Sequence, residues 1–237
     1  MPDPGRPGPL GRLWLRACRF SFSRRRLSRV SLERFVAAQA TDEPALVVHS
    51  LDIDRARLFP NAHTITARPG ADADVHTDPA YGALAEVPDA SYDVAVCTGL
   101  LEHVAEPAAL IAQLHRILRP GGRLVVTASA VFPFHGAPHN YFHLTPYGLR
   151  HLFREWSGFR TLQGSSGPYT TVAILLQRIN QQCDVFPPLR VCNEVLMKLL
   201  PRLDRFVLRQ YDTMAHRGPG AVTEHAMPAA LHAVVIR

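Results

Sequence analysis

The segment from Tyr92 to Ser129 constrains the fold of this chain more than any other. It holds two continuous apolar runs, YDVAVCT (Tyr92–Thr98) and RLVVTAS (Arg123–Ser129). Between them, Pro107 suits the first turn of a helix, Pro120-Gly121-Gly122 suits its end, and one helical face is apolar through Leu110, Ile111, Leu114, Ile117 and Leu118. Two strands without polar alternation, joined by a helix, predict a parallel βαβ unit covered on both faces.

Weaker patterns extend this unit in both directions. They predict strands at Ala45–Val48, His63–Ala67, Phe159–Gln163 and Leu231–Arg237, and helices over 27–38, from Thr145 onward and over 170–212. We therefore expect a basic, partly disordered arm at 1–40, an α/β domain at 41–165 plus 228–237, and a helical insertion at 166–227. The apolar stripe of the insertion, from Leu189 to Val207, is most simply a lid or packing element; a helix on a membrane surface is the alternative.

The positive charge of the chain is concentrated at its N-terminal end. Residues 1–34 carry nine arginines against Asp3 and Glu33, a balance of +7, whereas the whole chain has a formal net charge of +6. The arm could contact an anionic partner or an anionic membrane surface, or it could be a solvated tail. Nucleic acid is a weaker expectation, because no aromatic stacking platform or groove-reading motif accompanies the arginines.

The lack of a targeting signal and the spacing of the cysteines predict a cytoplasmic protein. No apolar run approaches the roughly 20 residues that span a bilayer, and Arg12, Arg16 and Arg19 interrupt the apolar residues near the N-terminus. The four cysteines form no CxxC pair and no metal-ligand spacing, so free thiols are expected.

Three short motifs follow one another in the segment 87–159: Asp89-Ala90-Ser91-Tyr92-Asp93, Glu102-His103-Val104 and Leu118-Arg119-Pro120-Gly121-Gly122. With these motifs the segment resembles the second half of a class I S-adenosylmethionine (SAM)-dependent methyltransferase domain of the broad type 11 kind. The later HGAPHNYFHLTPYGLR is similar to a subgroup with an HGxPxDY-type loop, although Asn140 and His143 stand where that subgroup has Asp and Arg. The resemblance implies a Rossmann-like α/β sheet with helices on both faces, a helical insertion before the last strand, and SAM as the cofactor.

The cofactor motifs of the family are only partly present. The resemblance places the SAM loop at 47–52, where His49, Ser50 and Asp52 replace the expected glycines, and the second strand ends without the acid that would bind the ribose. Asp78 matches the residue that usually meets the adenine amino group. Polar side chains such as Ser50 and Asp52 could supply new hydrogen bonds, but a Cβ where backbone approaches a ligand weakens binding.

Ligands of open α/β sheets bind outside the carboxyl ends of the strands. Cys97, Thr98 and Gly99 close the strand 92–98, so we expect them at the cofactor side, although Cys97 could equally be a small core residue. His103 follows, either as a general base or as a loop-capping residue. The loop after the next strand offers candidate acceptor-facing residues His135, His139, Tyr141 and His143.

The spacing of the three loop histidines does not predict a metal site. His135, His139 and His143 lie four residues apart, which would align them on a helix, but Pro133, Gly136 and Pro138 oppose a helix there. The segment also lacks a supporting carboxylate. We therefore expect no metal.

Three functions remain open on the sequence. The leading hypothesis is SAM-dependent methyl transfer to a small-molecule or sugar-containing acceptor. The second is a non-catalytic methyltransferase-like module that binds a partner and has lost SAM. The third is an RNA-binding protein that uses the arginine-rich arm.

Overall fold

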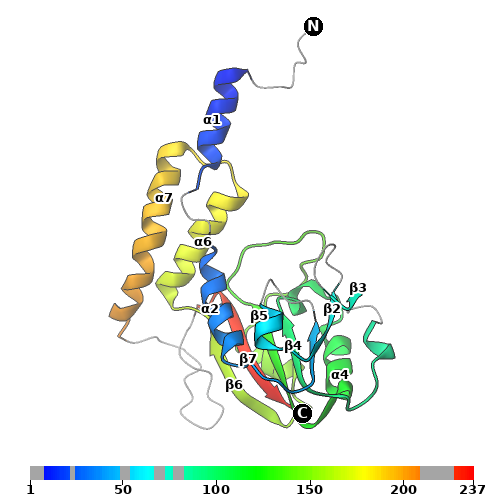
Figure 1. Ribbon diagram of the computed structural model, residues 1–237. Helices are drawn as coiled ribbons and strands as arrows, with labels where there is room; N and C mark the ends of the chain where they lie inside the picture. The colour runs from blue at the N-terminus through cyan, green and yellow to red at the C-terminus, as the bar shows by residue number, and fades with distance from the viewer. Residues whose placement is uncertain (1–7, 22–24, 49–53, 67–72, 77–82, 209–226) are drawn as a thin grey trace.

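A computed structural model describes residues 8–21, 25–48, 54–66, 73–76, 83–208 and 227–237. Its centre is a seven-stranded sheet with the order β3-β2-β1-β4-β5-β7-β6, in which β7 runs antiparallel to both neighbours and the other pairs are parallel (Figure 1). The strands are β1 (Ala45–Val48), β2 (Ala62–Thr66), β3 (Val75–His76), β4 (Tyr92–Thr98), β5 (Leu118–Ser129), β6 (Gly158–Gly164) and β7 (Ala230–Ile236). The Rossmann-like sheet expected from the resemblance is thereby confirmed.

Helices cover both faces of the sheet because β1, β4, β5 and β7 each alternate between two apolar cores. One core joins the sheet to α4 (Pro107–Ile117) and α5 (Pro146–Leu152). The other joins it to α2 (Leu27–Ala37) and the single turn α3 (Arg55–Leu58). Short 3-10 turns η1 (Ala83–Glu86) and η2 (Leu101–His103) flank β4.

The βαβ unit agrees with the sequence prediction, with one difference at β5. Strands β1 and β4 have the predicted bounds, and α4 begins at Pro107. β5, however, begins at Leu118, five residues before the predicted start, because Leu118 pairs with Tyr92 ahead of a register shift. The helix ends at Ile117, so Pro120-Gly121-Gly122, the predicted stop, lies inside the following strand.

Helix α2 packs into the apolar core on one face of the sheet. Leu32, Phe35 and Val36 are buried and pack on the face of β1, β4, β5 and β7. The expected boundary at residue 40, with all that precedes it as an arm, therefore does not match the packing. The expectation of disorder falls partly on residues 1–7 and 22–24, which lie outside the described residues.

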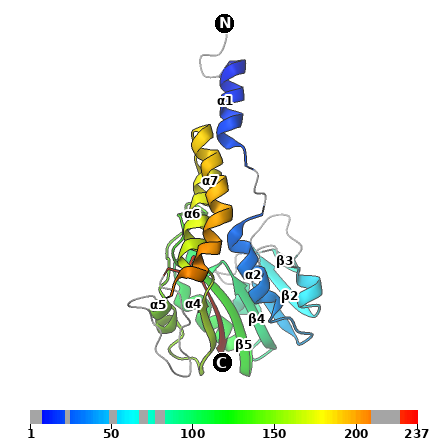
Figure 2. The ribbon, with the colours of Figure 1, turned by 90° about the vertical axis from the view of Figure 1, so that its left-hand side faces the viewer.

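Helices α1 (Pro9–Arg19), α6 (Pro168–Gln182), α7 (Pro187–Leu199) and the turn η3 (Leu200–Phe206) form a helical stalk. Figures 1 and 2 show that α1, α6 and α7 extend beyond the sheet instead of lying flat on it. Polar contacts join the stalk to α2, since Gln177 accepts from the Leu27 N–H at 2.8 Å and donates to the Arg25 carbonyl at 3.0 Å. Within the described residues, no helix is long and apolar enough to cross a membrane.

Helix α7 presents its apolar side outward. Its buried residues are Arg190, Asn193, Glu194 and Met197, whereas Val195 and Leu199 are 52% and 50% exposed. The buried side is a polar network, in which Asn193 donates to Asn180 at 3.0 Å and Ser21 donates to Glu194 at 2.7 Å. The expected packing of the apolar stripe as a lid is therefore wrong, because hydrogen bonds between helices occupy the inner face.

Candidate functional site

The carboxyl edge of β1 and β4 is where this topology places a ligand. The two strands are parallel neighbours, and the chain continues from β1 toward β2 on one side and from β4 toward β5 on the other. Such a switch point opens a crevice at the strand ends. At the end of β4, Gly99 has φ +62°, and its N–H donates to the Thr127 hydroxyl at 3.0 Å. The Oγ1 atom of the preceding Thr98 is buried without a hydrogen-bond partner among the described residues.

A cavity of about 150 Å³ lies at the carboxyl ends of β4 and β5, on the side of the sheet edge that faces β7. It is formed by the ends of β4 and β5, by β7, by the loop after β5, and by α2 and α6. Its lining residues are Arg26, Ser28, Arg29, Leu32, Gly99, Glu102, His103, Thr127, Ala128, Ser129, Phe132, His135, Arg178, Ala230 and His232. We call it the edge cavity.

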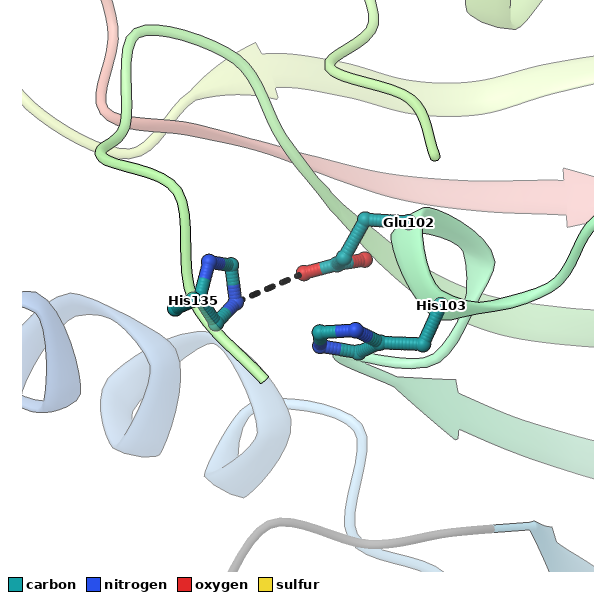
Figure 3. A group of neighbouring side chains, drawn as sticks. All are labelled: Glu102, His103 and His135. Atoms are coloured by element: carbon teal, nitrogen blue, oxygen red, sulfur yellow. Dashed lines mark ion pairs between the residues drawn. The ribbon is translucent and has the colours of Figure 1, made fainter. Parts of the chain in front are cut away.

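Glu102, His103 and His135 converge on the floor of the edge cavity and are called the floor cluster here. Figure 3 shows the three side chains pointing toward one another from η2 and from the loop after β5. Glu102 Oε1 accepts from the Ser129 hydroxyl at 2.7 Å and lies 4.0 Å from His135 Nε2. The Glu102 side chain is only 5% exposed, and its Oε2 atom has no hydrogen-bond partner within the described part of the chain.

Backbone contacts hold the loop after β5 against η2. The Tyr141 N–H donates to the Glu102 carbonyl at 2.8 Å, and His103 Nδ1 donates to the His139 carbonyl. His135 Nδ1 donates to the Pro133 carbonyl at 3.0 Å. Because a carbonyl oxygen only accepts, each imidazole carries its proton on Nδ1 when neutral, and each Nε2 keeps a lone pair.

His135 stays neutral in this environment. Its pKa is lowered mainly by desolvation, and the charges of His103 and Arg178 lower it further. The Pro133 carbonyl and the Glu102 carboxylate act in the opposite direction without reversing the shift. The ring therefore presents a hydrogen-bond acceptor, and not a cation, to the cavity at neutral pH.

Arginines from two helices form the opposite wall. Arg26 and Arg29 come from the start of α2, and Arg178 comes from α6, where its guanidinium lies 4.6 Å from the centroid of the Phe132 ring. Burial, together with repulsion from Arg26 and Arg29, lowers the pKa of Arg178 to about 10. Three cations that share one wall make that side of the cavity a site for an anion.

His232 closes the cavity from β7. It is 2% exposed and stacks on Phe35 of α2, with ring centroids 4.7 Å apart. Burial lowers its pKa to about 4, and its Nδ1 atom has no hydrogen-bond partner among the described residues. This histidine is a neutral packing residue at neutral pH.

The structure brings together only some of the residues singled out in the sequence. His103 and His135 are neighbours, with ring centroids 4.8 Å apart. His139 pairs with the Tyr141 hydroxyl at 3.0 Å, and His143 lies with its ring 6.3 Å from that of His135; these three residues are exposed.

The remaining predicted residues lie in the core or outside the described residues. Cys97 is fully buried in the core, and desolvation raises the pKa of its thiol to about 12. This placement matches the core interpretation of Cys97. His49, Ser50, Asp52 and Asp78 fall in 49–53 and 77–82, outside the described residues.

Sequence reasoning missed Glu102 and the arginine wall. Glu102 appeared only as part of the Glu102-His103-Val104 segment, although a carboxylate that soon follows a buried strand is itself a signal. Nothing in the sequence indicates that Arg178 shares a cavity wall with Arg26 and Arg29, about 150 positions earlier in the chain. Two larger hollows exist, of about 600 Å³ beside α6 and about 700 Å³ beside α2 and β6, but neither gathers imidazoles and a carboxylate.

Comparisons with known proteins agree with this architecture. Residues 16–173 match the model of a family described as a methyltransferase domain. A SAM-dependent methyltransferase from Archaeoglobus fulgidus superposes with a TM-score of 0.52 at 12% identity, over 95% of this chain and 98% of that one. A SAM-dependent methyltransferase from Mesorhizobium loti gives 0.50 at 12% identity, over 89% and 98%.

Two further similarities limit what the fold implies. The [4+2]-cyclase SpnF has a TM-score of 0.51 at 14% identity, over 89% of this chain and 81% of that one, so this fold also carries other chemistry. An uncharacterized 37.1 kDa protein in a transposon of Streptomyces fradiae is 45% identical over 53 residues. That match spans 22% of this chain and only 13% of the Streptomyces protein.

Proposed function

The chain belongs to the class I SAM-dependent methyltransferase family, and from this premise we propose that it transfers a methyl group from SAM to a small-molecule acceptor. The observation that carries the proposal is the edge cavity. It lies at the carboxyl ends of β4 and β5 and joins a glycine turn, a floor of hydrogen-bond acceptors and a basic wall. SAM supplies an activated methyl group, so the protein mainly has to align that group with a nucleophile.

Two features at the end of β4 suit an adenosyl cofactor. Gly99 turns the chain at φ +62° without a side chain, and the buried Thr98 Oγ1 atom lacks a partner among the described residues. We propose that Gly99 and Thr98 line the cofactor side. His49, Ser50, Asp52 and Asp78 complete it in this proposal, on the family resemblance alone, and Cys97 supports the strand from the core.

The floor cluster suits the nucleophile of the acceptor. The Nε2 atoms of His103 and His135 are hydrogen-bond acceptors, so a hydroxyl or amine of the acceptor can donate to one of them. This contact orients the nucleophile and provides a place for its proton. The exposed residues His139, Tyr141 and His143 would then contact the part of the acceptor that extends out of the cavity.

The basic wall suits an acceptor that carries a carboxylate or a phosphate. Arg178 is half-buried, and the repulsion from Arg26 and Arg29 that lowers its pKa would be relieved by an anion. This feature narrows the acceptor from any small molecule to an anionic one. A sugar phosphate or a sugar acid satisfies both the floor and the wall.

Matched acceptors test this proposal. We expect the protein to methylate hydroxyl or amino compounds that bear a carboxylate or a phosphate, and to prefer them to neutral analogues. Arg178→Gln should lower kcat/KM for the anionic compound about tenfold or more, because a charged hydrogen bond is lost. The same substitution should leave kcat/KM for the neutral analogue unchanged. Equal losses for both compounds would contradict the anion site.

The helical stalk and the basic arm suit an anionic membrane surface on the cytoplasmic side. The stalk carries exposed apolar residues on α1 and α7 and exposed cations on α1, α7 and η3. The apolar residues include Leu10, Leu13, Trp14, Leu189, Val195 and Leu199, and the cations are Arg16, Lys198, Arg202 and Arg205. Apolar area combined with basic charge is what interfacial helices use to bind anionic lipid. Pairing of two copies through this surface would instead bring cations together, so we favour the lipid.

A further inference from the structure

We propose that Glu102, His103 and His135 bind a divalent transition-metal ion at the floor of the edge cavity. The inference concerns ion binding alone and holds whether or not the chain transfers a methyl group. A bound ion would use the Nε2 lone pairs, so the nucleophile of an acceptor would then contact the ion instead of donating to the imidazoles. It is independent of the residues assigned to SAM, and it revises the expectation of no metal that the histidine spacing gave. Among the described residues, this is the one group of three potential ligands whose donor atoms lie close together, within 4.8 Å of one another.

The first argument is the tautomer of the two imidazoles. Both imidazoles donate from Nδ1 to a backbone carbonyl, His103 to His139 and His135 to Pro133. Metal-bound histidines are usually fixed in this way, by a carbonyl or carboxylate that accepts the other ring N–H. In the neutral form of each ring the Nε2 atom is therefore unprotonated, which is the state that a metal requires.

The second argument is the unsatisfied carboxylate. Glu102 Oε1 accepts from Ser129, but the buried Oε2 has no partner among the described residues. A buried carboxylate oxygen without a partner costs free energy, and two neighbouring imidazole lone pairs offer it no proton. A cation between the three groups resolves this, since it accepts electron pairs from all of them.

Ligand type and spacing indicate which ion fits. Two imidazoles and one carboxylate suit Zn²⁺, Fe²⁺, Co²⁺ or Ni²⁺ better than Mg²⁺ or Ca²⁺. Bonds of about 2.1 Å place tetrahedral ligands roughly 3.4 Å apart, so small side-chain rotations must close the present spacing of up to 4.8 Å. Three protein ligands leave a fourth position for a water or an acceptor oxygen.

The loop histidines alone could not reveal this site. His139 contributes its backbone carbonyl to His103, and the exposed His143 stands outside the group. The carboxylate comes from η2, 33 residues before His135 in the chain, and the loop brings the two together through the Tyr141–Glu102 backbone contact.

Titration with metal ions tests the proposal. The full-length protein, freed of metal with a chelator, is titrated with ZnCl₂ by calorimetry in a buffer without phosphate or carboxylate, and Co²⁺ absorption reports the coordination. We expect one equivalent of Zn²⁺ to bind and a four-coordinate Co²⁺ spectrum. Glu102→Gln and His135→Gln should each weaken Zn²⁺ binding at least tenfold, because each removes one ligand.

Two controls separate ligation from folding and from surface histidines. His139→Gln keeps the backbone carbonyl that fixes His103 and should bind Zn²⁺ as the original protein does. Thermal unfolding in the presence of chelator should show that every variant is folded. The proposal is overturned if the original protein binds no stoichiometric Zn²⁺, or if Glu102→Gln and His135→Gln bind it as tightly as His139→Gln does.

Discussion

At the scale of single residues, the position of His103 depends on the bare backbone of Gly136. A Cβ on Gly136 would lie 2.8 Å from His103 Cε1. The backbone of Gly136 also has φ +67°, a value that residues with a side chain rarely adopt. We expect Gly136→Ala to displace the imidazole and to weaken Zn²⁺ binding at least tenfold, with about 1 kcal/mol of lost stability. Calorimetry and thermal unfolding measure the two effects.

Gly148 provides the matched control for this substitution. A Cβ there meets its nearest neighbour at 3.4 Å, an ordinary contact, and Gly148 lies in α5 away from the floor cluster. Gly148→Ala should leave Zn²⁺ affinity unchanged. Equal effects of the two alanine substitutions would mean that the orientation of His103 does not matter to the site.

His232 makes the stability of the protein depend on pH. Its pKa is about 4 when folded and about 6.5 when unfolded, so between these values the unfolded chain binds the extra proton. Stability therefore falls as the pH decreases from about 6.5 toward 4, by about 3 kcal/mol in total from this group. In His232→Leu this contribution should be absent.

Chemical denaturation at pH 7 and at pH 4.5 checks this effect. The loss of unfolding free energy between the two pH values should be about 2 to 3 kcal/mol larger in the original protein than in His232→Leu. Because all other titrating groups are common to both proteins, their contributions cancel. Identical losses would show that His232 is not held neutral by burial.

The residues of the site show how far sequence reasoning reaches. His103 and His135 could be selected because each follows a predicted strand of the βαβ unit, and strand ends meet at one edge. Their tautomers and the partnership with Glu102 depend on how the loop 130–145 folds back on η2. That path is set by backbone hydrogen bonds such as Tyr141 to Glu102, which leave no pattern in the sequence.

At the scale of elements, α2 links the N-terminal region to the sheet. Phe35 is 6% exposed and packs in the core of one sheet face and against His232. Phe35→Ala should lower the free energy of unfolding by about 3–5 kcal/mol, the usual range for a buried phenylalanine. The exposed neighbour Arg34 is the control, and Arg34→Ala should change stability by about 0.5 kcal/mol or less.

Denaturant unfolding distinguishes the two descriptions of this region. A loss near zero for Phe35→Ala would restore the view that residues 1–40 are an arm outside the domain. A large loss would establish α2 as a structural element of the fold. Sequence periodicity alone could not decide this, because an amphipathic helix of 11 residues is compatible with either.

The elements differ in how well their sequence defines them. The bounds of β1 and β4 were predictable because buried parallel strands are apolar throughout. The segment of α7 was correctly predicted to be helical, but the prediction that its apolar face is buried was wrong. Periodicity identifies two faces, and the assumption that the apolar face is buried fails where Asn180, Asn193 and Glu194 form a buried network.

At the scale of the whole molecule, the exposed apolar face of the stalk predicts binding to anionic lipid. The protein should co-sediment with vesicles that contain phosphatidylserine, less so at high salt, and not with neutral phosphatidylcholine vesicles. Val195→Asp combined with Leu199→Asp should abolish binding, because both side chains are about half exposed on α7. Arg16→Gln with Lys198→Gln should weaken it about tenfold or more.

Analytical ultracentrifugation supplies the alternative outcome. A stable dimer that Val195→Asp and Leu199→Asp dissociate, without vesicle binding, would show that a second copy covers this face. Equal binding to neutral and anionic vesicles would contradict the role of the basic residues. Methyl transfer in the edge cavity does not require either membrane binding or dimer formation.

Calorimetric titration of the purified protein with S-adenosylhomocysteine tests most directly whether the chain binds the cofactor of methyl transfer. We predict a dissociation constant near or below about 100 μM, which at millimolar ligand stabilises the fold by more than about 1 kcal/mol. Gly99→Ala and Asp78→Ala should both weaken binding. No heat and no thermal shift would contradict methyl transfer and favour a methyltransferase-like module that binds a partner without the cofactor.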